Sequence, residues 1–158
     1  MKTVGDVMQH KARLQRERLE SEGLSGGEVY SIPPIASVFE AIQMMSDHHV
    51  GALPVMIEGK LVGIVSERDY ARKVILKDKS SKTTRVSEIM TRDVVSVSTQ
   101  DRMSDCVDLM TSHHIRHLVV VDQGEVSGML SLRDLFMEII DEQSETIDQL
   151  EGYIRGGH

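Results

Sequence analysis

The strongest constraint on this chain is an internal repeat. The segment GIVSERD, from Gly63 to Asp69, returns 65 residues later as GMLSLRD, from Gly128 to Asp134, and residues 29–69 align with residues 94–134 without a gap. Most of the pairs that differ exchange one aliphatic residue for another. Because a repeated unit buries its apolar face against its own copy, the sequence predicts two packed copies of one unit.

A second match marks where each unit begins. Residues 3–9 match residues 85–91 at an offset of 82, so the first unit holds 17 additional residues between about residues 10 and 28. This insertion interleaves basic residues with Glu17, Glu20 and Glu22 and closes with a Ser-Gly-Gly sequence at residues 25–27. We expect each opening segment to form a short turn of helix, and the insertion to form a solvated helix or a loop with a flexible end.

The hydrophobic pattern predicts strand, helix, strand, strand and helix in each unit. In the first unit these are residues 29–32, a helix that begins at the capping box of Ser37 and Glu40 and ends near His48 and His49, residues 52–56, residues 61–65, and residues 66 to about 76. In the second unit they are residues 94–97, 102–113, 118–121, 126–130, and a helix from residue 131. The predicted fold class is therefore α+β, with two β-α-β-β-α repeats.

Composition limits the classes of function. With 3% aromatic residues and no Trp, aliphatic side chains and ten Met must fill the core. The single Cys106 cannot form an internal disulfide, the first residues are too polar for a signal peptide, and no apolar run approaches the roughly 20 residues of a membrane span. A net charge of −7 argues against nucleic-acid binding. We expect a soluble, cytoplasmic protein without membrane contact.

The repeated Ser-x-x-Asp motif has two interpretations. Ser66 with Asp69, and Ser131 with Asp134, fit a capping box at a helix start. An Asp at a helix start can equally accept hydrogen bonds from the two hydroxyls of a ribose, while the free N–H groups and the dipole there favour phosphate. Both interpretations remain open from the residues alone.

These features together resemble a tandem pair of cystathionine-β-synthase (CBS) domains. The resemblance rests on the β-α-β-β-α unit, the Val-x-x-Ile-Met opening, the His-Leu-x-Val strand and the Gly-aliphatic-aliphatic-Ser-x-x-Asp ending, and it covers residues 3 to about 142. The long tail and residues 66–73 are similar to the small stand-alone bacterial members. We accordingly divide the chain into a first repeat (residues 1–80, with the insertion), a second repeat (81–142) and a helical extension (143–158).

The resemblance implies packing about a pseudo-twofold axis, with two clefts for adenosine-containing ligands. AMP is the first choice of ligand, followed by ATP or NAD(H), and the module is expected to signal to an effector protein in trans. The implied ligand residues are the ribose-contacting Asp69 and Asp134, the nearby Ser66 and Ser131, the adenine-lining Val50 and Ile115, the phosphate-contacting Arg116 and His117, Ala52 at the first-repeat position that matches His117, and Arg133. Because the first repeat has Gly51 and Ala52 where the second has Arg116 and His117, the two clefts are expected to differ in phosphate charge.

We weighed three other functions. An enzyme is not expected, because no spacing proposes a nucleophile with its base, paired carboxylates or a Gly-rich phosphate loop. Metal binding by the adjacent pairs His48-His49 and His113-His114 is not expected, because neighbouring side chains point in different directions. A ligand-independent dimerisation module is the main alternative, since the tail carries an apolar seam of Phe136, Ile140, Ile147, Leu150 and Ile154, with Gln143 in register. We expect a homodimer in either case.

Overall fold

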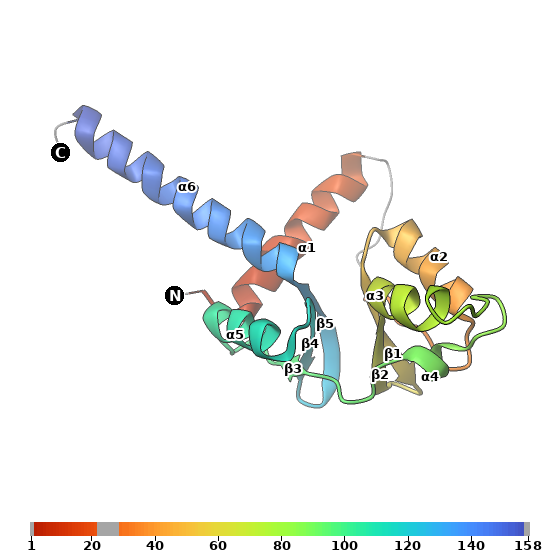
Figure 1. Ribbon diagram of the computed structural model, residues 1–158. Helices are drawn as coiled ribbons and strands as arrows, with labels where there is room; N and C mark the ends of the chain where they lie inside the picture. The colour runs from red at the N-terminus through yellow and green to blue at the C-terminus, as the bar shows by residue number, and fades with distance from the viewer. Residues whose placement is uncertain (1, 22–28, 157–158) are drawn as a thin grey trace.

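The computed structural model describes residues 2–21 and 29–156, which form two similar halves, each with a small β-sheet (Figure 1). β1 (Ala52–Ile57) and β2 (Lys60–Ser66) form an antiparallel hairpin in the first half. In the second half, β3 (Ser96–Val97), β4 (His117–Asp122) and β5 (Glu125–Ser131) lie in that order, with β3 parallel to β4. The predicted α+β class and the doubled unit are confirmed.

Local signals set the first helix and the first hairpin of the repeat. α2 (Val38–His48) begins at the predicted capping box, in which the Glu40 N–H donates to Ser37 Oγ and the Ser37 N–H donates to the Glu40 carboxylate, both at 3.1 Å. It ends at His49, whose φ of 55° is left-handed. β1 and β2 are joined through Glu58 and Gly59, which both have positive φ, the conformation of a type I′ turn.

Two elements of the first half differ from the prediction. The strand expected over residues 29–32 is reduced to a single parallel bridge between Ile32 and Val55. Pro33, which has no N–H, prevents the pairing from continuing past Ile32, and residues 29–31 do not pair with any strand in the described residues. The helix expected from Ser66 to about residue 76 is present, but it starts as α3 (Glu67–Tyr70) and continues as the π-helical turn η1 (Ala71–Ile75).

The opening helix of each repeat packs into the half that is formed mainly by the other repeat. α1 (Val4–Ser21) places Val4 and Val7 in the hydrophobic core of the second half. The matching helix of the second repeat, α4 (Val86–Ile89), places both of its terminal residues in the core of the first half. Each core therefore depends on a helix from the other repeat, and the exchange is reciprocal, in keeping with a pseudo-twofold arrangement.

The two cores are mainly aliphatic, as composition predicted, with Met45 and Met90 in the first and Met110 in the second. The first contains Ile32, Val38, Ala41, Met45, Leu53, Val55, Val65, Val74, Val86, Ile89 and Met90, and the second contains Val4, Val7, Val97, Cys106, Met110, Leu118, Val120, Leu130 and Leu135. Since each core combines residues from the predicted segments 1–80 and 81–142, those boundaries describe the repeats in sequence. They stay a prediction as folding units.

α1 is longer than the opening turn that we expected. It runs without a break through the first part of the insertion to Ser21, so the helical interpretation holds for residues 10–21. Most of these residues are exposed, but Lys11 is partly buried against the second half. The predicted flexible end at residues 25–27 lies outside the described residues.

The second half is completed by two helices. α5 (Met103–His113) buries Cys106, and this burial raises the pKa of the thiol to about 11, which fits the predicted role as a small core residue. α6 (Leu132–Gly156) begins beside β5, and its later turns project away from the body (Figure 1). None of the helices in the described residues combines the length and the hydrophobicity that a bilayer crossing requires.

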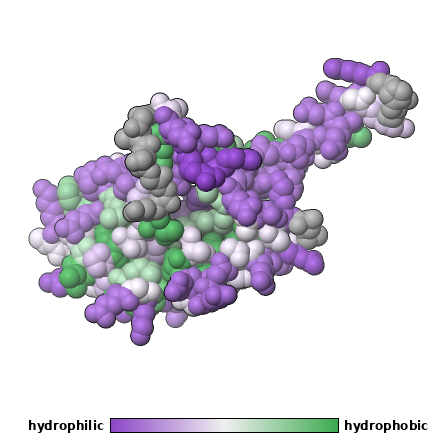
Figure 2. Space-filling view, turned by 180° about the vertical axis from the view of Figure 1, so that it is seen from behind, coloured by the Kyte–Doolittle hydropathy of each residue, from purple (hydrophilic) through white to green (hydrophobic). Residues whose placement is uncertain are grey.

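The apolar seam of α6 is exposed. Phe136, Ile140, Ile147, Leu150 and Ile154 have exposed fractions between 53% and 78%. Seen from behind, apolar residues gather over the sheet-bearing body, while the side of the projecting helix that is in view is mostly hydrophilic (Figure 2). The helix is therefore amphipathic beyond the point where it contacts the rest of the chain.

Candidate functional site

Each Ser-x-x-Asp motif lies where a strand ends and a helix begins. Ser66 and Asp69, here the first pair, join β2 to α3, and Ser131 and Asp134, the second pair, join β5 to α6. The serine N–H donates to the aspartate Oδ2 at 2.9 Å in the first pair and at 2.8 Å in the second. The aspartate N–H donates to the serine Oγ at 3.1 Å in both. Both motifs therefore form capping boxes, and the ribose role stays a prediction.

The first pair is neutralised by a lysine of its own helical segment. Lys73 Nζ lies 3.1 Å from Asp69 Oδ1 and donates to the Ile89 carbonyl at 2.8 Å. This lysine is four residues after the aspartate, one helical turn away. The counter-ion of the first pair is thus local in sequence.

The second pair is neutralised from the far end of the chain. Lys11 Nζ, on α1, lies 2.9 Å from Asp134 Oδ2 and donates to the Met129 carbonyl at 2.8 Å. The lysine side chain is 33% exposed and the aspartate side chain 18%. Sequence reasoning did not single out Lys11, because the two residues are 123 positions apart and no local pattern links them.

The strand entries pack directly against these helix starts. The Glu67 N–H of α3 donates to the Gly51 carbonyl at 3.1 Å, and the Leu132 N–H of α6 donates to the Arg116 carbonyl at 2.8 Å. The predicted residues before and at the start of β1 and β4 therefore lie beside the Ser-x-x-Asp motif of their own repeat.

The two repeats also meet at this point. A Cβ atom at Gly51 would lie 3.3 Å from both Cε1 and Nε2 of His117, so the imidazole of the second repeat lies directly against the backbone of the first. Arg68 Nη1 donates to the His114 carbonyl at 3.3 Å, across the same junction. The structure thus brings predicted residues of both repeats to one interface.

The remaining predicted residues differ in exposure. Val50 and Ile115 are half-buried and pack against the first and second core, respectively. Ala52 is only 3% exposed and belongs to the core, and its predicted ligand contact stays a prediction. Arg116 and Arg133 are exposed.

His117 is held in its neutral form. Burial lowers the pKa of its imidazole below the ordinary 6.5, and the charges of Lys11 and Arg116 lower it further, against the opposing effect of Asp134. At neutral pH this ring can form hydrogen bonds, but the permanent positive charge near the second pair comes from Lys11 and Arg116.

The paired histidines have separate surroundings. The His48 ring stacks on Tyr30, with centroids 3.6 Å apart and an angle of 14° between the planes. His113 Nδ1 lies 3.0 Å from the Leu109 carbonyl of its own helix. The structure therefore assigns each of these two rings a contact near its helix end.

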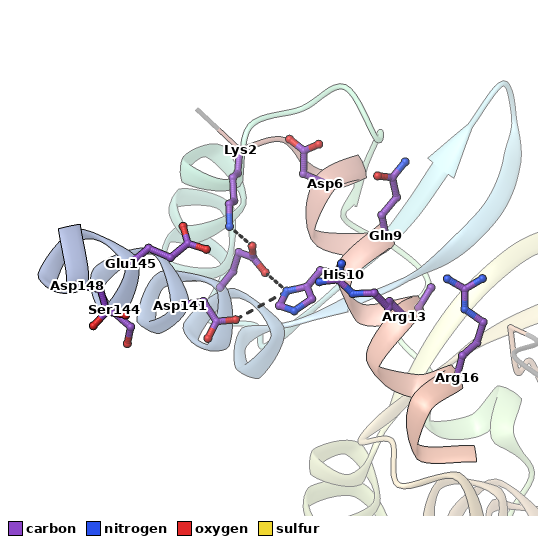
Figure 3. A pocket seen from close by; sticks show the side chains of 12 residues that line it. Lys2, Asp6, Gln9, His10, Arg13, Arg16, Asp141, Ser144, Glu145 and Asp148 are labelled. Atoms are coloured by element: carbon purple, nitrogen blue, oxygen red, sulfur yellow. Dashed lines mark hydrogen bonds and ion pairs between the residues drawn. The ribbon is translucent and has the colours of Figure 1, made fainter. Parts of the chain in front are cut away.

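A polar groove lies elsewhere, between α1 and α6. It has a volume of about 960 Å³ and none of the predicted site residues lines it. Its α1 side presents His10, Arg13 and Arg16, and its α6 side presents the acids Asp141, Glu145 and Asp148 (Figure 3). The opposite charges of the two walls favour the approach of the two helices.

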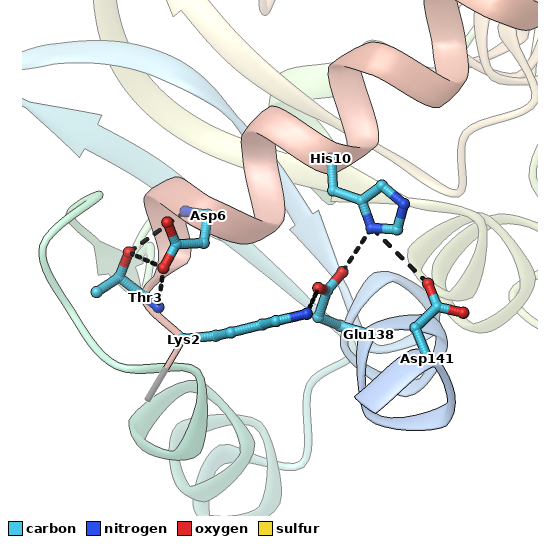
Figure 4. Close-up of polar contacts among 6 residues, drawn as sticks. All are labelled: Lys2, Thr3, Asp6, His10, Glu138 and Asp141. Atoms are coloured by element: carbon cyan, nitrogen blue, oxygen red, sulfur yellow. Dashed lines mark hydrogen bonds and ion pairs between the residues drawn. The ribbon is translucent and has the colours of Figure 1, made fainter. Parts of the chain in front are cut away.

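The two helices are joined at the base of this groove by Glu138, which is only 4% exposed. Its carboxylate accepts hydrogen bonds from Lys2 and, at 2.8 Å, contacts His10 Nδ1, which also lies 3.8 Å from Asp141 Oδ2 (Figure 4). Burial opposes ionisation of Glu138, but the hydrogen bonds from His10 and Lys2 outweigh it and lower its pKa below 4.5. His10, Glu138 and Asp141 also form a cluster with ligand atoms within 4.8 Å of one another, which sequence spacing could not reveal.

Comparison with known proteins identifies the fold. The CBS domain family matches residues 22–76 and 86–141. The CBS domain-containing protein CBSX3, mitochondrial, of Arabidopsis thaliana is 37% identical over 127 residues, which is 77% of this chain and 62% of that protein. The chain therefore spans less than two-thirds of this relative.

Solved structures of CBS domains have the same fold as this chain. The CBS domain NE2398 is 42% identical, with a TM-score of 0.75 over 88% of this chain and 98% of the other. The CBS domain pair of protein MJ0100, solved in complex with 5-methylthioadenosine and S-adenosyl-L-methionine, is 27% identical, with a TM-score of 0.65 over 73% of this chain and 92% of the other. The predicted tandem pair is confirmed.

Proposed function

This chain belongs to the CBS-domain family, whose pairs are regulatory modules, and we propose that it binds an adenosine-containing ligand where its two halves meet. AMP is the first choice, with ATP or NAD(H) next. Binding changes how the halves or a homodimer pack, and an effector protein in trans responds to that change. In this proposal the chain does no catalysis, acts in the cytoplasm and binds neither nucleic acid nor membrane.

The observation that carries this proposal is the duplicated Ser-x-x-Asp motif at two helix starts beside one interface. A carboxylate has two oxygens and about four acceptor positions, so an aspartate that caps a helix through one oxygen can still accept from a ribose hydroxyl. The MJ0100 pair, whose complex holds two adenosine compounds, supports the ligand class. The half-buried Val50 and Ile115 supply apolar surface of the kind that adenine needs.

The first test is to identify what the purified protein carries. Mass spectrometry of the small molecules released on denaturation is expected to find an adenosine compound. Thermal unfolding with AMP, ATP, NAD, NADH and S-adenosylmethionine then ranks the ligands, because a ligand at 100 times its dissociation constant adds about 2.7 kcal/mol, or roughly 5–10 °C in a domain of this size. If no compound moves the midpoint, the proposal fails. If one does, and Asp69→Ala and Asp134→Ala both leave the shift intact, the site lies elsewhere.

A second candidate is an assembly module that needs no ligand. The exposed seam of α6 favours it, because Ile140, Ile147 and Ile154 alternate with Phe136 and Leu150 at the spacing of a two-stranded coiled coil. Truncation after Asp141 is expected to convert a dimer to a monomer in analytical ultracentrifugation. A truncated chain that stays dimeric would show that the seam is not the contact. Loss of the dimer without any ligand response in the full chain would favour this candidate over the first.

A further inference from the structure

We propose that Lys11, carried by α1, is a phosphate-binding residue of the second pair, so that this pair selects adenosine compounds that carry a phosphate group. The inference rests on the proposed function and refines its ligand class. It starts from the contact between Lys11 and Asp134, which joins the N-terminal helix to the start of α6 at 2.9 Å.

The position of Lys11 reflects a difference between the repeats. In the first half, the backbone after α4 turns back to β2, and the Thr91 N–H donates to the Ile64 carbonyl at 2.8 Å. Met129 is the β5 residue that matches Ile64. Because α1 continues as a helix where α4 ends, no equivalent backbone group in the described chain returns to β5, and Lys11 Nζ reaches the Met129 carbonyl instead.

The helix that carries Lys11 is held firmly in place. Gly128 lies under the end of the Met8 side chain, whose terminal methyl would have to move to admit a Cβ at this position, so α1 lies directly on β5. Glu138, one turn after Asp134 on α6, forms hydrogen bonds with Lys2 and with His10 of α1. Lys11 is therefore presented to the second pair by a helix that is anchored on both sides.

The contacts of the second pair leave groups for both parts of a nucleotide. The hydrogen bonds of the Asp134 carboxylate within residues 2–21 and 29–156 all use Oδ2, which leaves Oδ1 to accept a ribose hydroxyl. Lys11 uses two of its three N–H groups in these contacts, and its side chain is 33% exposed. In the first pair, by contrast, Lys73 engages Asp69 Oδ1 while Ser66 engages Oδ2.

The charges near the second pair also favour a phosphate group. Lys11 and exposed Arg116 place two permanent positive charges near one aspartate, and both charges lower the pKa of the neighbouring His117 ring. A phosphate gains from this field, because charge-assisted hydrogen bonds are about twice as strong as neutral ones. An uncharged nucleoside gains nothing from it, and a sulfonium compound is repelled. The second pair is thus suited to AMP rather than to adenosine or S-adenosylmethionine.

Isothermal titration calorimetry of the full chain, which measures its affinity for AMP and for adenosine, tests this inference. Lys11→Gln is expected to weaken AMP binding by about tenfold or more, the loss of one charge-assisted hydrogen bond, and to change adenosine binding by less than about twofold. Lys11→Arg should retain most of the AMP affinity. Arg13→Gln removes the same charge from the same helix and is expected to leave both affinities unchanged.

Amine acetylation of the wild-type chain gives a second measurement that needs no variant. AMP is expected to protect Lys11 from acetylation more than adenosine does, as mass spectrometry of the peptides would show. Three outcomes would each overturn the inference while leaving the regulatory function in place. Lys11→Gln could bind AMP as tightly as the wild-type chain does, or it could lose AMP and adenosine affinity to the same extent. Lys11 could also stay unprotected from acetylation at saturating AMP. If neither AMP nor adenosine binds the wild-type chain, the inference fails, and the proposed function then depends on the thermal shifts with ATP, NAD, NADH and S-adenosylmethionine.

Discussion

The two Ser-x-x-Asp pairs share a sequence and a capping geometry, yet they draw their counter-ions from different parts of the chain. Asp69 is paired with Lys73 of its own helical segment, whereas Asp134 is paired with Lys11 of the N-terminal helix. The repeat therefore determines the cap. The source of the lysine differs for two reasons: the second repeat has Glu138 at the position that matches Lys73, and the opening helix that ends after one turn in α4 continues to Ser21 in α1.

This difference gives α1 polar side-chain contacts in addition to its part in a core. Both helices fill a core, but α1 also supplies the counter-ion of the second pair and the His10 contact to Glu138 of α6. A change in the second pair can therefore reach the N-terminal helix directly. Three experiments, in order of expected effect, test or refine this contrast.

The largest effect is expected from the exchanged core residues. Val7→Ala and Ile89→Ala each remove methyl groups from a buried site of the other half and should lower the free energy of unfolding by roughly 2–4 kcal/mol. Urea denaturation measures the loss. Leu14→Ala, on the exposed side of α1, is the matched control and should change stability by less than about 0.5 kcal/mol. A Val7→Ala effect as small as that of Leu14→Ala would show that α1 does not build the second core.

The next effect concerns Glu138 and depends on pH. Because its pKa in the folded chain is below the ordinary 4.5, its stabilising contribution is complete above that pH and is lost as the pH falls through the lower folded value. The free energy of unfolding of the wild-type chain should exceed that of Glu138→Gln by roughly 1–3 kcal/mol at pH 7. This difference should become smaller below about pH 4.5. Urea midpoints between about pH 3 and pH 7 measure this. Glu145→Gln, an exposed acid of the same groove, is the control; a constant gap at every pH would contradict the assignment.

The smallest effect is expected at His117. Since its pKa is lowered, the unfolded chain takes up a proton before the folded chain does, and the folded state loses relative stability as the pH falls through 6.5. In NMR titration its ring should titrate below pH 6.5. Lys11→Gln should raise the pKa of His117, and Lys73→Gln should leave that pKa unchanged. Equal shifts in the two variants would mean that the lysines do not distinguish the two pairs electrostatically.

Sequence alone predicted the parts of the fold that depend on local chemistry. The repeat, the capping box of Ser37 and both Ser-x-x-Asp junctions depend on residues close together in the chain. The strand expected over residues 29–32 was too long, because a hydrophobic pattern does not show how many of its residues lie beside a partner strand.

Contacts between distant segments could not be predicted in the same way. The match between residues 3–9 and 85–91 located the opening helices, but not the half into which each one packs. Lys11 belongs to a charged insertion that the sequence predicts to be solvated, because its partner Asp134 is separated from it by most of the chain. The cluster around Glu138 was missed for the same reason, since it needs α1 and α6 to lie side by side.

The absence of a side chain at Gly51 has an evolutionary consequence. Any residue with a Cβ at this position would press against the His117 ring, and an arginine matching Arg116 would need still more space. A substitution that gave the first repeat a side chain at position 51 would therefore require the His117 ring to move as well. The contact thus couples position 51 of one repeat to position 117 of the other, and the duplicated halves do not vary independently at this point.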